Sequence, residues 1–167
     1  MSRHRVDAAL AGFTLVELMV ALAVLAILAA ISVPSFDNMI LSNRLSTLVN
    51  DYTAAVRIAR SEALKRNVPV VLCRSADGSS CGGSDGWEQG WVIRAGTAVL
   101  RSYPAASSGY RLSSSVTTLT FQPNGFATSA ASLTACRTSP LGSQERQISV
   151  SASGKVRISR SSNGTCP

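Results

Sequence analysis

A single carboxylate inside a long apolar run is the feature of this sequence with the clearest chemical consequence. Glu17 is the only charged residue between Phe13 and Phe36. A carboxylate costs roughly 2.5 to 3.5 kcal/mol at the centre of a bilayer, and a buried opposite charge offsets such a cost. The sequence therefore predicts that Glu17 forms an ion pair with a cationic group in apolar surroundings.

The other chemistry-bearing residues do not form a catalytic pattern. The only histidine is His4, before the apolar run, and the nine acidic residues contain no H-E-x-x-H or paired-carboxylate motif. No glycine-rich phosphate loop precedes a helix, and the serines lack a recognisable base. We therefore expect no enzyme activity, no catalytic residue and no cofactor.

The apolar run at residues 13–33 is long enough to span a membrane. As a helix it would rise about 31 Å, close to the ~30 Å hydrocarbon thickness of a bilayer. Arg3 and Arg5 precede it, which predicts a cytoplasmic N-terminus and a periplasmic or extracellular domain after Pro34. A plain secretory signal or signal anchor is the alternative, but an ordinary signal has a shorter apolar region followed by a small-x-small cleavage site. We expect a single-pass inner-membrane protein.

The segment GFTLVE at residues 12–17 resembles, residue for residue, the G-F-T-L-x-E signature of type IV prepilins and secretion pseudopilins. The resemblance implies that residues 1–12 are a leader, that a prepilin peptidase cuts between Gly12 and Phe13, and that the new amine of Phe13 is N-methylated. It also implies that Glu17 pairs with the terminal amine of a neighbouring subunit in a fibre. The implied partners are other minor pilins and a major pilin, or pseudopilins.

Helical spacing continues beyond the membrane run. Apolar residues recur in steps of three and four across residues 40–64, which predicts an amphipathic helix ending at about Arg66. Pro34 removes a backbone donor inside this helix and predicts a kink or local unwinding; type IV pilins carry a proline at the same distance from the cleavage site. We expect residues 13–33 to form a membrane or fibre-core half, and residues 34–66 an amphipathic half that packs on a sheet.

From residue 67 onward, short β-branched and aromatic runs alternate with turn residues, as in antiparallel sheets. The predicted strands are residues 68–74, 90–94, 98–103, 116–122, 133–137, 147–152 and 155–159. Ser153 and Gly154 predict a tight hairpin turn between the last two strands. The predicted fold class is α+β, with a long N-terminal helix packed on an antiparallel β-sheet or sandwich domain at residues 67–167.

The four cysteines, Cys73, Cys81, Cys136 and Cys166, form an even set. In a chain that leaves the cytoplasm such a set predicts disulfides, and four cysteines allow three pairings. We favour Cys73–Cys81 and Cys136–Cys166, because each closes a compact unit of sequence. Zinc is the alternative, but no C-x-x-C pair is present and no histidine follows the leader, so we expect no metal.

Two elements of the β-rich half resemble the GspH/FimT branch of the pilin superfamily. WEQGWVI at residues 87–93 resembles its W-x-x-G-W-x-hydrophobic element, and FQPNGFA at residues 121–127 its F-x-x-x-G element. We expect Trp91 in the core, Gly90 at a close backbone approach and Gly125 in a positive-φ turn. The chain is most similar to FimT-type minor pilins of type IV pili. A minor pseudopilin of the type II secretion system is the alternative.

The net charge of +7 favours a polyanionic partner, although solubility alone is an alternative explanation. GKVR at residues 154–157 resembles the G-R-x-R motif of FimT proteins that bind DNA for natural transformation. It departs from the motif at Lys155, which keeps the charge but lacks the bidentate fork of arginine.

In a strand, Lys155 and Arg157 would share one face, with Arg160 at the strand end and with Arg137 and Arg146 extending the patch. The expectation is sequence-independent, salt-sensitive contact with double-stranded DNA. The alternative is a basic edge strand that prevents edge-to-edge pairing of sheets.

Overall fold

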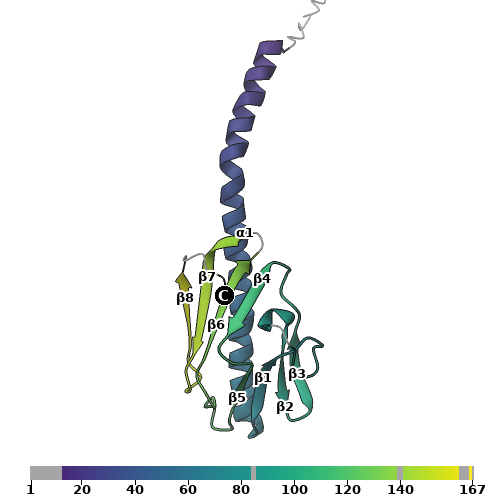
Figure 1. Ribbon diagram of the computed structural model, residues 1–167, viewed down its shortest axis with the longest axis vertical. Coiled ribbons are helices and arrows are strands. Elements are labelled where there is room, and N and C mark those ends of the chain that lie inside the picture. The colour runs from purple at the N-terminus through teal and green to yellow at the C-terminus, as the bar shows by residue number, and fades with distance from the viewer. Residues whose placement is uncertain (1–12, 84–85, 139–140, 162–165, 167) are drawn as a thin grey trace, which may run out of the picture. The chain divides into compact units, whose positions relative to one another are not determined.

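The computed structural model describes residues 13–83, 86–138, 141–161 and 166 (Figure 1). The predicted leader and Gly12 lie outside the described residues. The chain divides into two units, Met1–Met39 and Ile40–Pro167. The second unit contains every residue of the buried core, so the β-rich half and the adjoining part of the helix form one packing unit.

The helix α1 covers Leu15–Arg66, 52 residues, and its predicted end at about Arg66 is confirmed. The hydroxyl oxygen of Thr14 accepts the backbone N–H of Glu17 at 3.2 Å, which satisfies one of the free donors of the first turn. Asn67 follows with a φ of 55°, the left-handed conformation that commonly ends helices. The helix continues through position 34, so the unwinding expected there does not occur; the kink stays a prediction.

Two four-stranded antiparallel sheets follow the helix, with strand orders β3-β2-β1-β5 and β4-β6-β7-β8. The strands are β1 Val70–Arg74, β2 Trp91–Ala95, β3 Ala98–Tyr103, β4 Tyr110–Ser114, β5 Thr118–Phe121, β6 Ala131–Thr138, β7 Leu141–Val150 and β8 Val156–Ser161. A short 3-10 helix, η1, covers Trp87–Gln89. The predicted α+β class and the helix-on-sheet arrangement are confirmed.

Two strand predictions were wrong in instructive ways. Strand β4 was missed, because only Leu112 of its side chains is fully buried and the serines around it are typical of a loop. Strand β7 begins at Leu141, six residues before the predicted start at Gln147. Its polar first half pairs with β6, and β8 joins it only from Glu145 onward.

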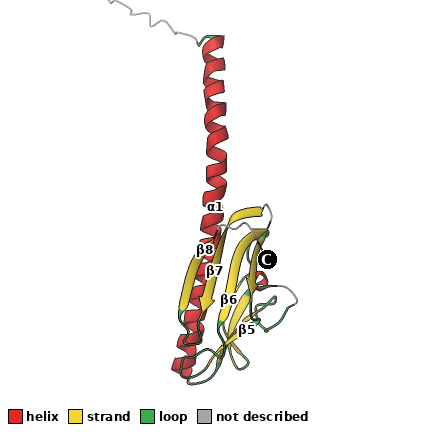
Figure 2. Ribbon diagram, turned by 60° about the vertical axis from the view of Figure 1, so that its left-hand side comes forward, coloured by secondary structure: helices red, strands yellow, loops and turns green. Residues whose placement is uncertain are grey.

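The strands lie against the second half of α1 (Figure 2), and one face of that half supplies the centre of the core. Its fully buried residues are Leu41, Leu45, Tyr52, Ala55, Val56, Ala59 and Ala63. The ring of Tyr52 lies edge-on to Trp87 at 5.3 Å and to Trp91 at 6.0 Å between centroids. These edge contacts are the favoured geometry of aromatic pairs, so the three rings lock the helix to the first sheet.

The GspH/FimT-like elements have the structural roles expected of them. Trp91 is 2% exposed. Gly90 has a φ of 108°, and a Cβ there would lie 2.6 Å from the carbonyl oxygen of Tyr103. Gly125 has a φ of 78°. Both glycines are therefore required by backbone geometry.

Replacing Tyr52 by phenylalanine is expected to stabilise the fold by about 1 kcal/mol. The Tyr52 hydroxyl is buried and has no hydrogen-bond partner in the described part of the chain, and its burial raises the pKa of the phenol. The substitution removes an unsatisfied polar group and keeps the ring contacts. Urea denaturation followed by tryptophan fluorescence measures the change, with the partly exposed Tyr110→Phe as control. A loss of stability in Tyr52→Phe alone would show that the hydroxyl has a partner in solution.

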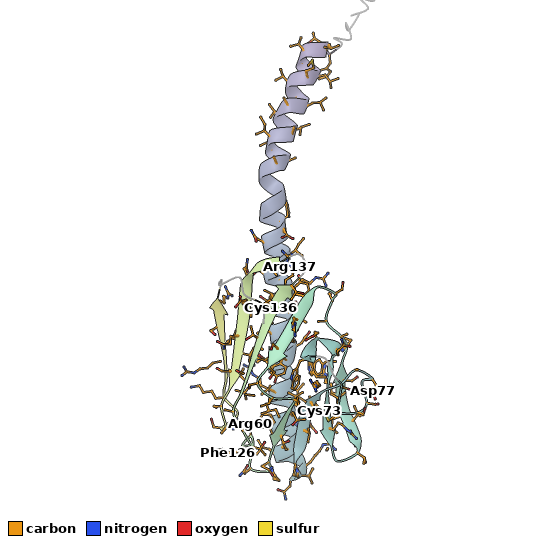
Figure 3. The ribbon with its side chains drawn as sticks, in the orientation of Figure 1. Arg60, Cys73, Asp77, Phe126, Cys136 and Arg137 are labelled. Atoms are coloured by element: carbon orange, nitrogen blue, oxygen red, sulfur yellow. A yellow bond between two sulfur atoms is a disulfide. The ribbon has the colours of Figure 1, made fainter. Side chains whose placement is uncertain are left out.

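Both predicted disulfides, and the pairing, are present in the structure (Figure 3). Cys73 and Cys81 are joined with a Cα–Cα distance of 5.5 Å, and Cys136 and Cys166 with 5.6 Å. Both distances lie within the usual range for disulfides. Since all four thiols are used, none is left to bind zinc, and no cluster of metal-ligating residues occurs among the residues that the structure describes.

The loop closed by the first disulfide is organised around Asp77. One carboxylate oxygen accepts the Ser75 hydroxyl at 2.9 Å and the backbone N–H groups of Ser79 and Ser80 at 2.8 Å each. The other accepts the Ser80 hydroxyl at 2.6 Å. These bonds, the Ser80 hydroxyl foremost, hold the pKa of Asp77 well below its ordinary value. The loop is therefore built around an ionised carboxylate.

Candidate functional site

The first unit presents apolar side chains on all sides of its helix. Every described side chain from Phe13 to Ala30 is exposed, Phe13 at 84% and Leu15 at 73%. No helix in the described part of the chain is long and apolar enough to cross a membrane. An apolar surface of this kind is larger than monomeric soluble proteins leave uncovered, which marks it as an interaction surface.

Glu17 is exposed on this apolar helix. Its backbone is fixed by the bond to Thr14, and its carboxylate takes part in no salt bridge among the described residues. Thr14 and Glu17 have the spacing of a capping box, in which a threonine lies three residues before a glutamate at the start of a helix. The Glu17 carboxylate is therefore accessible to a cation from another molecule.

The basic residues of β8 are divided between the two faces of the sheet. Arg157 and Ser159 lie opposite Ser149 and Gln147, whereas Arg160 lies opposite Arg146 on the alternate face. Lys155 precedes the strand and lies opposite Ser151, whose N–H donates to its carbonyl at 3.0 Å. Lys155 and Arg157 therefore share a face, as expected.

Arg160 corrects the sequence interpretation. The strand does not end at Ser159 but continues to Ser161, so Arg160 lies within it and on the face opposite Arg157. It remains exposed. A ligand that binds to the face carrying Lys155 and Arg157 therefore does not contact Arg160 on that face.

Arg137 and Arg146 do not extend the exposed patch. Arg137, labelled in Figure 3, lies on β6 and is 7% exposed. Arg146 lies on β7 and is 4% exposed. Arg146 donates to the Ser42 hydroxyl at 3.1 Å and to the carbonyl of Glu145 at 3.1 Å. Burial, with a smaller contribution from Arg160, lowers the pKa of Arg146. Arg146 therefore belongs to the packing between α1 and the second sheet, and Arg137 is buried on β6.

Three cations of α1 that the sequence interpretation did not select lie beside Lys155. Arg57, Arg60 and Lys65 line a cavity of about 660 Å³ together with the turn before β8. They are spaced over two turns of one helix, a signal available in the sequence. Their partner in space, Lys155, is about 90 residues further along, which is why the sequence did not join them.

The geometry of the helix and the two sheets defines a class of protein. A helix whose first half is apolar on all sides, and whose second half packs on antiparallel sheets, is the architecture of type IV pilin-like proteins. Residues 10–33 match the prokaryotic N-terminal methylation motif. Residues 48–154 match the family described as type II transport protein GspH, and the chain belongs to that family.

Solved structures show the same fold. The type IV minor pilin FimU of Pseudomonas aeruginosa is 22% identical, with a TM-score of 0.56 over 71% of this chain and 90% of that one. The minor pseudopilin EpsH of the Vibrio cholerae type 2 secretion system is 9% identical, with a TM-score of 0.50 over 70% of this chain and 96% of that one. No curated protein matches the sequence. The chain is thus a pilin-like subunit of the GspH/FimT family, as the resemblance implied.

Proposed function

We propose that this chain is a minor pilin of a type IV pilus. The observation that carries the proposal is the apolar helix surface from Phe13 to Ala30 with its single acid, Glu17. Such a surface suits the membrane before assembly and the packed helices of a fibre afterwards. Prepilin peptidase cleaves between Gly12 and Phe13, the Phe13 amine is N-methylated, and the β-rich domain is periplasmic until assembly.

A deletion strain tests membership of the pilus. Loss of surface pili or of natural transformation, with normal exoprotein release, is the expected result. Blocked exoprotein release with normal pili would instead assign the chain to a type II secretion system, the alternative that shares its fold. Complementation with the intact gene is the control.

We further propose that the domain binds double-stranded DNA through the outer face at the start of β8. Lys155 and Arg157 are exposed, share one face and form no salt bridge among the described residues. Arg157 lies on the edge strand β8 and Lys155 directly precedes it, so both are accessible to a duplex. Phosphate contacts of this kind are independent of base sequence and weaken steeply with salt.

The double variant Lys155→Gln/Arg157→Gln is expected to weaken binding to a short duplex by at least about tenfold at low salt, because two phosphate contacts are lost. Fluorescence anisotropy at two salt concentrations measures it. The control is Arg111→Gln/Arg101→Gln, which removes equal charge from strands β4 and β3. An equal loss in both double variants would reduce the effect to net charge. Absence of binding by the parent at low salt would leave the basic residues as protection of the sheet edge.

A further inference from the structure

The cavity between the end of α1 and the turn before β8 has an unusual charge composition. Of its lining residues, Arg57, Arg60, Lys65 and Lys155 are cationic and none is acidic. Its volume of about 660 Å³ exceeds what one small anion needs, so the cavity is an open pocket rather than a packing defect. Ser61 adds a hydroxyl to the lining.

Arg60, labelled in Figure 3, packs against the glycine turns at Gly125 and Gly154. A Cβ at Gly154 would lie 2.9 Å from Cδ of Arg60, and a Cβ at Gly125 would lie 3.3 Å from its Nε. Both glycines have positive φ, 75° and 78°. The glycines of the two motifs singled out in the sequence thus share one role, because each leaves room for the same arginine.

Packing holds the side chain of Arg60 in place, and one of its guanidinium nitrogens has no hydrogen-bond partner among the described residues. Its Nε is buried and makes no hydrogen bond to any residue that the structure describes. A buried N–H without an acceptor costs free energy, and charged groups cost more than neutral ones. An anion in the pocket would therefore meet the terminal nitrogens of the Arg60 guanidinium rather than Nε, and their planar arrangement suits a bidentate contact.

The carboxylate nearest in sequence does not neutralise this cluster. Glu62 accepts Nε of Arg66 at 2.6 Å and lies 3.8 Å from Nζ of Lys65. The hydrogen bond from Arg66 lowers the pKa of Glu62, so the acid stays ionised and committed to that pair. Arg57, Arg60 and Lys155 form no salt bridge among the described residues.

We propose that this pocket binds a phosphate group. Arg60 is the positioned donor, Arg57 and Lys155 supply further positive charge, and Lys65 lies at the margin beside Glu62. The proposed source of the phosphate is DNA, so this inference rests on the proposed DNA binding. Lys155 belongs to both sites, because it lines the pocket and directly precedes β8. A free phosphate offers the same chemistry, and the experiment separates the two sources.

The test uses the full chain in a nonionic detergent and a fluorescein-labelled 15-base-pair duplex. Arg60→Gln is expected to weaken binding by about tenfold, the range of a charge-assisted hydrogen bond, and to lower the slope of log K against log salt by about 0.9. Arg60→Lys, which keeps the charge but not the fork, is expected to recover part of the loss. Arg111→Gln, an exposed arginine on β4, is the matched control and is expected to change the affinity by less than about twofold.

Lys155→Gln guards against misfolding, because its side chain is exposed and supports no packing. A similar loss of affinity in Lys155→Gln and Arg60→Gln, with melting temperatures like the parent's, supports the pocket. Equal binding by parent and Arg60→Gln overturns it while leaving the outer face of β8 intact.

A parent that binds no DNA refutes the DNA source, and inorganic phosphate then decides the pocket. A rise in melting temperature of the parent in phosphate over chloride at equal ionic strength, absent in Arg60→Gln, supports a free phosphate. No difference between the two proteins overturns the pocket altogether.

Discussion

Replacement of Glu17 by valine is expected to leave the chain in the membrane but to reduce its incorporation into fibres by at least about tenfold. The carboxylate is exposed and without a salt bridge among the described residues, and the prediction rests on the proposed assembly into a fibre, in which another chain supplies its cation. The proposed cation is the terminal amine of a neighbouring subunit. Losing one partner of a buried ion pair costs roughly 3–5 kcal/mol, which exceeds the effect needed to exclude a subunit from a fibre.

Immunoblots of membrane and sheared-fibre fractions measure this result. Glu17→Gln separates charge from shape, because it keeps the size of the side chain and loses only the negative charge. Glu17→Asp keeps the charge and is expected to restore part of the incorporation. If Glu17→Gln enters the fibre as well as the parent, the ion pair is not the basis of assembly.

Features of the fold could be predicted where the residues that determine them are close together in the sequence. The end of α1 at Arg66 follows from the residues after it, since Asn67 adopts a left-handed conformation there and Pro69 cannot continue a helix. The two disulfides could be paired because each joins neighbouring segments. Strand β4 could not be predicted, because a strand at the sheet edge with one buried residue is defined by its ladder with β6 rather than by its own pattern.

The candidate site was predicted in part for the same reason. Lys155 and Arg157 could be placed on one face from alternation alone. Arg146 could not be recognised as buried, because its place in the core depends on the true start of β7 and on a contact with Ser42, 104 residues away. Arg60 was missed since its role depends on two distant glycine turns that pack against it. Charge and periodicity identify surfaces, but only tertiary packing shows which cation is held in place.

Loss of the second disulfide is expected to have the largest effect on the stability of the domain. The bond between Cys136 and Cys166 closes a separation of 30 residues, for which the loop-entropy relation gives about 3.5 kcal/mol. In a unit of this size that corresponds to a fall in Tm of about 10 °C. The double variant Cys136→Ala/Cys166→Ala, followed by circular dichroism on heating, measures it.

The first disulfide provides the matched control. Cys73→Ala/Cys81→Ala opens a separation of 8 residues, for which the same relation gives about 2.5 kcal/mol. The two double variants are also expected to loosen different parts of the domain. Cys166 follows the edge strand β8, so its release should speed amide exchange along β8, whereas opening the first loop should not. Because Arg157 lies on β8, DNA binding should weaken in Cys136→Ala/Cys166→Ala, by the cost of ordering the strand. It should not weaken in Cys73→Ala/Cys81→Ala. Equal effects of the two variants on β8 exchange would contradict a role for the Cys136–Cys166 bond in holding the basic edge in place.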